Sequence, residues 1–159
     1  LPDVLVKAEK SCMAQMVEAY DRVGGNIIAV DAVPEDEVSK YGVIAPTGRD
    51  GNLIAMSGMV EKPAKQDAPS NLKITGRYIL QPEIFDLLET QERGAGGEIQ
   101  LTDSMAKLME VQDFFALEYE GQDYDCGSKL GYFEAVLAYA LDHAEIGEGV
   151  RDMVRKAAG

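Results

Sequence analysis

The chain has 159 residues, enough for one domain with a real hydrophobic core, and its hydrophobic share of 46% is ordinary for a globular protein. The formal net charge of −13 argues against a surface that binds nucleic acid. The sequence has no apolar run of membrane-spanning length, and no basic segment followed by an apolar stretch at its start. We therefore expect a cytoplasmic protein with no nucleic acid partner and no membrane partner.

The first part of the chain predicts a strand, a helix and a second strand. Residues 1–6 resemble the tail of a strand, and Ser11 is a suitable N-cap for a helix over residues 11–22 that ends at the glycines at 24–25. The unbroken apolar run at 26–30 is typical of a strand buried on both faces, as in a parallel sheet. We interpret this succession as a βαβ unit.

The middle of the chain predicts three further strands. An acidic loop precedes a strand at 41–45, and Asp50-Gly51 predicts a tight hairpin turn into a partner strand at 53–60. The next strand, 71–80, alternates apolar residues with Lys73, Thr75, Arg77 and Ile79, so we expect its polar face to front a cleft or solvent.

The remaining elements are mostly helical. The glycine-rich segment 93–97 lacks the spacing of a phosphate-binding loop, so we interpret it as a connector. Apolar residues from Met13 to Val23 recur with helical spacing on one face, and we expect the stripes Met13–Met16 and Phe133–Tyr139 to form core. The predicted elements are helices at 82–90, 99–109, 130–143 and 150–157, a strand at 114–119 and a turn at 124–127.

Four charged residues could carry chemistry. Glu61 and Lys62 end an apolar strand just before Pro63, which stops it, and charges at a strand end lie where open α/β sheets bind ligands. The alternative is a solvated strand end. Asp3 lies at what looks like the C-terminal edge of a strand, and Asp125 lies after the late strand, at the start of a turn that leads into a helix. For these two residues a loop, turn or capping role is the alternative to a ligand role.

Five segments stand out together, in order along the chain: residues 60–63, 68–72, 75–78, 97–103 and 124–132. Together they resemble bacterial UDP-glucose pyrophosphorylases, which are UTP–glucose-1-phosphate uridylyltransferases. The resemblance covers nearly the whole chain and weakens after about residue 143.

The resemblance implies an α/β fold with a Rossmann-like mixed sheet of the nucleotide-diphospho-sugar transferase type, a β-hairpin and C-terminal helices. It also implies that the N-terminal strands and the glycine-rich nucleotide loop are absent. On this basis residues 1–159 are expected to form a single domain, the C-terminal sugar-binding part of the catalytic domain.

The resemblance also assigns roles to residues. Asp3 and Asp125 would hold one Mg²⁺, a cation that prefers carboxylate, phosphate and water oxygens. Lys62 would neutralise the sugar phosphate, so these three are the expected catalytic residues. Glu61 would bind sugar hydroxyls. The remaining substrate-binding positions are the backbone at Tyr41 and Gly42, and Ile74, Gly76 and Tyr78 on the strand beside the sugar.

Three other residues receive no catalytic role. Arg77 stays undecided, and the single histidine, His143, is typical of a surface or helix-end residue. Cys126 is expected to be a buried structural thiol because no base or cation pattern surrounds it. With Cys12 it makes two reduced thiols, too few for a disulfide framework or a zinc site.

The implied reaction makes UDP-glucose and pyrophosphate from UTP and glucose 1-phosphate, with Mg²⁺ as cofactor, in a protein expected to be a homo-oligomer. This chain by itself is expected to be inactive. Two alternatives stay open: another sugar-1-phosphate nucleotidyltransferase, such as a thymidylyltransferase, and a non-catalytic binding or assembly module.

Overall fold

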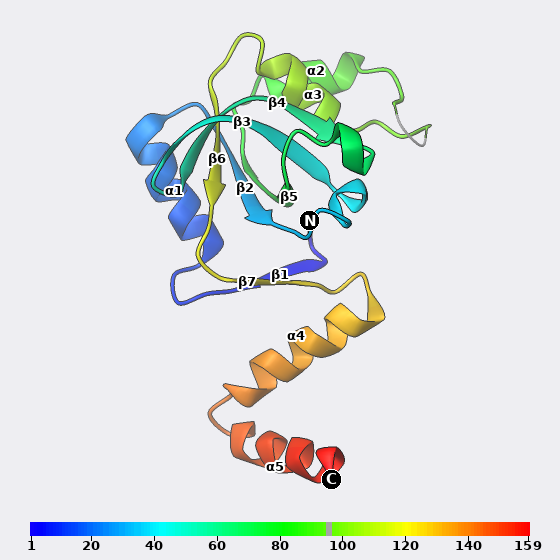
Figure 1. Ribbon diagram of the computed structural model, residues 1–159. Helices are drawn as coiled ribbons and strands as arrows, with labels where there is room; N and C mark the ends of the chain where they lie inside the picture. The colour runs from blue at the N-terminus through cyan, green and yellow to red at the C-terminus, as the bar shows by residue number, and fades with distance from the viewer. Residues whose placement is uncertain (95–96) are drawn as a thin grey trace. The chain divides into compact units, whose positions relative to one another are not determined.

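The computed structural model describes residues 1–94 and 97–159, so the predicted connector at 93–97 lies partly outside the described residues. The chain divides into two compact units (Figure 1). The larger is Lys10–Glu120, and the smaller combines Leu1–Glu9 with Gly121–Gly159. Each is described by itself, and the expectation of a single domain stays a prediction.

The larger unit is built on a closed five-stranded mixed sheet in the order β2-β5-β3-β4-β6. β2 and β6 are parallel, whereas the other neighbouring strands are antiparallel. The expected α/β class with a mixed sheet is confirmed; its closure is not visible in the sequence pattern. The elements are α1 (Cys12–Val23), β2 (Asn26–Ala32), η1 (Val38–Lys40), β3 (Gly42–Asp50), β4 (Leu53–Glu61), η2 (Lys65–Asp67), β5 (Leu72–Ile79), α2 (Ile84–Thr90), α3 (Leu101–Leu108) and β6 (Phe114–Glu118).

The hairpin of β3 and β4 forms where the sequence predicts it. Asp50 pairs with Leu53, so only two residues connect the strands, and the first of them, Gly51, has φ 61°. Glycine adopts that left-handed conformation without a steric penalty. The register shifts around Pro46, which has no N–H for the ladder.

β2 is buried through residues 26–30, as its apolar run predicts, but the βαβ interpretation is wrong. β1 (Val4–Lys7) belongs to a separate two-stranded sheet, in which it pairs antiparallel with β7 (Gln122–Asp125). β7 includes part of the segment predicted as a turn. An apolar run indicates burial on both faces but does not specify which strands become its neighbours.

α1 begins at its predicted cap, since Ser11 Oγ accepts the Ala14 N–H at 3.2 Å. Its buried residues are Cys12, Met16 and Ala19, whereas Met13 is 41% and Val17 47% exposed. The predicted core stripe is therefore wrong at Met13, and Val17, on the same predicted face, is exposed too. The three buried residues stand at i, i+4 and i+7, which is one face of a helix.

The main core of the larger unit joins the sheet to α2 and α3, which pack against each other (Figure 1). α3 also contacts β4, whereas α1 contacts β2 and β5. The buried members of this core are Ile28, Val30, Ile44, Ile54, Met56, Met59, Leu72, Ile84, Met105, Leu108, Phe114 and Ala116.

The smaller unit holds β1, β7, α4 (Lys129–Leu141) and α5 (Gly147–Ala158). α4 contacts both β7 and α5, and the two helices lie one after the other (Figure 1). Phe133 is 70% and Tyr139 43% exposed, so the predicted core stripe on α4 is wrong. α4 is apolar over most of its circumference, and one helix and a two-stranded sheet bury only part of it. Among the described residues, no helix has both the length and the apolar character to cross a membrane.

Candidate functional site

The acid and base at the end of β4 lie beside the start of β3. Gly42 pairs with Glu61 across the two antiparallel strands, and the Lys62 N–H donates to the Tyr41 carbonyl at 3.0 Å. Because β3 begins where β4 ends, the hairpin brings these two segments together. Four of the residues expected to bind the substrate therefore form one cluster.

The two charged side chains of this cluster differ in freedom. The side chain of Glu61 is 17% exposed, and its Oε2 accepts a hydrogen bond from Thr102 Oγ1 at 2.8 Å. The Lys62 side chain is 60% exposed, and its Nζ lies 3.7 Å from Glu61 Oε1. The site thus combines a carboxylate held by a hydrogen bond with an exposed ammonium that a phosphate could reach. Sequence reasoning missed Thr102, which lies in a matching segment but shows no chemical pattern of its own.

Gly42 leaves room for the Glu61 carboxylate. A Cβ at Gly42 would stand 2.9 Å from Glu61 Oε2 and 3.3 Å from Ile74 Cδ1. The first separation is too short for carbon and oxygen, so a larger residue would displace the carboxylate. The same measurement shows that Ile74, another predicted site residue, reaches the cluster from β5.

Lys62 has a left-handed backbone. Its φ is 46°, and among residues 1–94 and 97–159 no other non-glycine residue has a positive φ. Such a conformation costs on the order of 1–3 kcal/mol and persists only where the surroundings impose it. Here it redirects the chain between the last strand residue, Glu61, and Pro63.

Tyr78 lies close enough to Glu61 to feel its charge. Burial, and next the negative charge of Glu61, raise the pKa of the Tyr78 phenol above its ordinary value. Tyr78 also packs against the main core. Gly76, with φ 73°, precedes it on β5. The structure therefore places the Tyr78 phenol near the cluster as a neutral group.

The expectation that the polar face of β5 fronts a cleft or solvent is wrong for its first half. Lys73 is 9% and Thr75 3% exposed. Lys73 Nζ lies 5.2 Å from the centre of the Tyr41 ring, a cation–π contact that lets a buried ammonium keep a favourable partner. Sequence alternation shows which residues share a face but not what covers that face.

Asp3 and Asp125 meet in the smaller unit. Val4 pairs with Asp125, and the Cys126 N–H donates to the Asp3 carbonyl at 2.7 Å. Asp125 Oδ1 lies 3.0 Å, and Asp3 Oδ2 3.3 Å, from the position that a Cβ at Gly127 would take. Both carboxylates thus face one point. Asp3 precedes β1, so the expectation that it follows a strand is wrong; antiparallel pairing still places it beside the end of β7.

These two carboxylates suit a hard cation. Among the described residues, no group of three or more His, Cys, Asp or Glu side chains gathers around a possible metal position. Mg²⁺ does not need such a group, because it commonly takes one or two carboxylates and fills its other positions with phosphate oxygens and water. Asp3 and Asp125 fit that description. Their approach to Lys62, which lies in the other unit, stays a prediction.

The structure suggests no catalytic role for Arg77, Cys126 or His143 among the described residues. Burial raises the pKa of the Cys12 thiol, and the positive charge of Arg77 opposes this in part, so Arg77 lies near Cys12. Cys126 is half-buried rather than buried, and both cysteines are free. His143 Nδ1 accepts the Glu145 N–H at 3.2 Å, consistent with a residue at a helix end.

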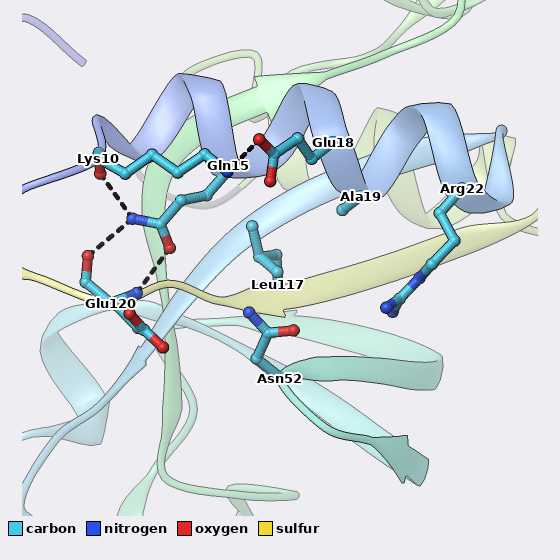
Figure 2. Close-up of a pocket in the computed structure, with 8 residues that line it drawn as sticks. All are labelled: Lys10, Gln15, Glu18, Ala19, Arg22, Asn52, Leu117 and Glu120. Atoms are coloured by element: carbon cyan, nitrogen blue, oxygen red, sulfur yellow. Dashed lines mark hydrogen bonds and ion pairs between the residues drawn. The ribbon is translucent and has the colours of Figure 1, made fainter.

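A separate polar cavity of about 390 Å³ lies between α1, β6 and the hairpin turn (Figure 2). Its polar groups largely satisfy one another. The Gln15 amide donates to the Lys10 and Glu120 carbonyls and accepts the Glu120 N–H. Lys10 forms an ion pair with Glu18 (Figure 2). None of the predicted site residues lines this cavity, so it is not assigned to the substrate.

Comparison with known families gives a result that is independent of this arrangement. A family model described as Nucleotidyl transferase matches residues 2–141. The chain belongs to the nucleotidyl transferase family.

Its relatives in this family include curated UTP–glucose-1-phosphate uridylyltransferases. The Staphylococcus epidermidis enzyme is 40% identical over 156 residues, which are 98% of this chain and 54% of that protein. The Bacillus subtilis enzyme is 46% identical over 146 residues, covering 92% of this chain and 50% of that protein. The chain thus spans about half the length of the curated relatives it matches.

Solved structures of nucleotidyl transferases show the same similarity. A UDP-glucose pyrophosphorylase from Acinetobacter baumannii superposes with a TM-score of 0.87 at 39% identity, covering 99% of this chain and 55% of that one. A UDP-glucose pyrophosphorylase complexed with UDP-glucose gives 0.85 at 39% identity, covering 90% and 55%. A UTP-bound Acinetobacter baumannii enzyme gives 0.85 at 41%, covering 97% and 54%.

The comparisons also correct one expectation, that the chain is the C-terminal portion of such an enzyme. The family model matches residues 2–141 of this chain. The part of the relatives that the chain matches is their N-terminal half. The expectation rests on the strand-like opening of the chain and the missing nucleotide loop. The structure gives that opening strand, β1, a partner within the chain in β7.

Proposed function

We propose that a protein carrying this chain transfers a uridylyl group from UTP to glucose 1-phosphate. A phosphate oxygen of the sugar forms a bond to the α-phosphorus, the bond from that phosphorus to the β-phosphate oxygen breaks, and pyrophosphate leaves. The observation that carries the proposal is the cluster of Glu61 and Lys62 against the backbone of Tyr41 and Gly42. The names of the relatives supply the substrate class.

In this reaction the residues of the larger unit bind and orient the sugar phosphate. Lys62 is exposed enough to reach the phosphate and neutralise its charge, which positions the attacking oxygen. Glu61 accepts hydrogen bonds from sugar hydroxyls through the oxygen that Thr102 does not occupy. Ile74, Gly76 and Tyr78 bound the sugar on its other side.

Asp3 and Asp125 would hold Mg²⁺ in the proposed enzyme. When bound, that ion supplies positive charge for the phosphate oxygens that become negative during phosphoryl transfer. The carboxylates themselves repel each other when they are both ionised and close, so a cation between them is electrostatically favoured.

The cytoplasmic location and the homo-oligomer expected from the sequence stay predictions.

The test is pyrophosphate release from the complete protein with glucose 1-phosphate and each nucleoside triphosphate in turn. Turnover that is highest with UTP supports the proposal. Preference for dTTP would favour the thymidylyltransferase alternative, and no release with any triphosphate would favour a binding or assembly module. Because this chain spans about half of its relatives, we expect the 159-residue chain alone to show no turnover.

Substitution of the carboxylate distinguishes a sugar contact from a structural one. Glu61→Gln keeps the shape of the side chain but removes its charge. We expect it to weaken the affinity for glucose 1-phosphate far more than the affinity for UTP, because the side chain contacts hydroxyls and not the base. Equal losses for both substrates would mean that Glu61 is structural.

A further inference from the structure

We propose that Thr102 is a positioning residue that fixes the Glu61 carboxylate for sugar binding. The inference rests on the proposed function, since it concerns the same site. Thr102 is 9% exposed, and its hydroxyl donates to Glu61 Oε2 across 41 residues of sequence. It is the second residue of α3, and no role follows for it from the sequence pattern.

The support beneath this hydroxyl is rigid. α3 buries Met105 and Leu108 almost completely in the main core. Ser104, two residues after Thr102, is fully buried and donates to Gln91 Oε1. Threonine is branched at Cβ, which restricts its χ1 angle. The donor therefore has a defined position relative to β4, which a residue on an exposed loop would lack.

Two groups lie close to the same carboxylate oxygen, the Thr102 hydroxyl and the backbone at Gly42. Thr102 Oγ1 lies 2.8 Å from Glu61 Oε2, and a Cβ at Gly42 would stand 2.9 Å from that oxygen and 3.6 Å from Thr102 Oγ1. Oε2 is therefore confined on one side by the β3 backbone and held on another by a donor. The carboxylate cannot rotate to exchange its oxygens without breaking the hydrogen bond.

The second oxygen is left for the ligand. Glu61 Oε1 faces Lys62 Nζ at 3.7 Å, longer than a hydrogen bond, so it keeps capacity to accept. By assigning one oxygen to Thr102, the structure presents the other in one orientation beside the ammonium. Binding then does not have to order the carboxylate, which lowers the entropy cost of capturing the sugar.

Two variants of the complete protein test this role. Thr102→Val has nearly the same shape but no donor, and Thr102→Ser keeps the donor. We expect Thr102→Val to raise the KM for glucose 1-phosphate by roughly ten-fold or more while the KM for UTP stays unchanged. Thr102→Ser should stay within about three-fold of the wild type. A general loss of structure would affect both substrates alike.

A double-mutant cycle asks whether Thr102 acts through Glu61. If it does, adding Thr102→Val to Glu61→Ala should raise the KM for glucose 1-phosphate little further, because Glu61→Ala has already removed the carboxylate that Thr102 orients. Fully additive effects, or an unchanged KM in Thr102→Val alone, would overturn the proposal.

A measurement without substrate separates this inference from the proposed function. The carboxyl ¹³C signal of Glu61 should shift in Thr102→Val and not in Thr102→Ser, whatever the protein catalyses. If the wild type does not turn over glucose 1-phosphate, the proposed function fails, and an unshifted carboxyl signal then overturns the positioning role too. A shifted signal supports it as the means by which Glu61 is held.

Discussion

Asp3 and Asp125 bring their carboxylates to one point although the whole larger unit lies between them in sequence. Asp125 Oδ1 and Asp3 Oδ2 lie 3.0 and 3.3 Å from the position a Cβ at Gly127 would occupy. The antiparallel pairing of β1 with β7 produces this meeting, because it places the start of one strand beside the end of the other. A cation shared by the two is the simplest chemical use of the arrangement.

The first prediction concerns this shared cation. Either Asp3→Ala or Asp125→Ala should abolish Mg²⁺-dependent turnover in the complete protein, and the double variant should add little, because the two carboxylates act as a unit. Titration of Mn²⁺ followed by calorimetry should show the same loss of binding. Clearly separable, multiplicative effects on turnover would contradict a common site.

A glycine variant tests the same site without removing a ligand. Gly127→Ala should weaken metal binding, since its Cβ would crowd both carboxylates, whereas the backbone N–H at 127 can still donate to Asp125 Oδ1. Gly149→Ala is the matched control, because nothing lies within 4 Å of its added Cβ. Equal metal affinity in the two variants would be evidence against convergence on one ion.

The second prediction separates the function of Lys62 from its contribution to stability. Lys62→Ala should lower turnover by roughly two to three orders of magnitude, while the free energy of unfolding changes by less than about 0.5 kcal/mol. Lys62→Gly should lose the same activity but gain up to about 1 kcal/mol of stability, because glycine accepts φ 46° without a Cβ clash. Turnover assays and urea unfolding measure the two effects.

A nearby lysine provides the control for charge. Lys65 is also exposed, and its Nζ lies 3.6 Å from Glu35. Lys65→Ala removes the same charge from a neighbouring segment and should leave turnover unchanged. A wild-type rate in Lys62→Ala, or an equal loss in both variants, would remove Lys62 from the site.

The third prediction concerns the space at Gly42. Gly42→Ala should reduce the affinity for glucose 1-phosphate and cost roughly 1–3 kcal/mol of stability, since its Cβ would overlap Glu61 Oε2. Gly48→Ala, on the same strand, meets nothing within 4 Å and should bind the sugar phosphate like the wild type. Calorimetric titration of both variants gives the comparison, and similar affinities would show that the carboxylate can move freely.

The fourth prediction follows from the raised pKa of Tyr78. Burial and then the charge of Glu61 raise the phenol pKa above its ordinary value of 10.0. The unfolded chain therefore releases this proton at a lower pH than the folded protein does. The stabilising effect of Tyr78 is complete below about pH 10 and is lost as the pH rises through the folded-state pKa.

Urea unfolding between about pH 8 and pH 11 should show this loss. The free energy of unfolding of the wild type should fall more steeply above about pH 10 than that of Tyr78→Phe, which has no proton to release. Parallel curves for the two proteins would mean that the Tyr78 phenol titrates alike in the folded and unfolded states.

The local features of this protein follow from short segments of sequence. Ser11 caps α1, Asp50-Gly51 closes the hairpin, and Pro63 ends β4 just after the acid and base. In each case the physical cause acts within a few residues: a side-chain acceptor for free N–H groups, a permitted positive φ, or a missing donor. The ordered motifs likewise indicate the family, because the residue types in each motif define its side-chain chemistry.

The tertiary structure alone decides which distant segments meet. The pairing of β1 with β7, the closure of the five-stranded sheet, and the contact of Thr102 with Glu61 each join segments far apart in sequence. Alternation and apolar runs indicate how many faces of a strand are buried, but they do not specify which strands lie next to it in the sheet. The choice depends on the total burial and hydrogen bonding of the folded chain. The family resemblance leads us to expect that Asp3 and Asp125 meet, whereas the contact of Glu61 with Thr102 is visible only in the folded chain.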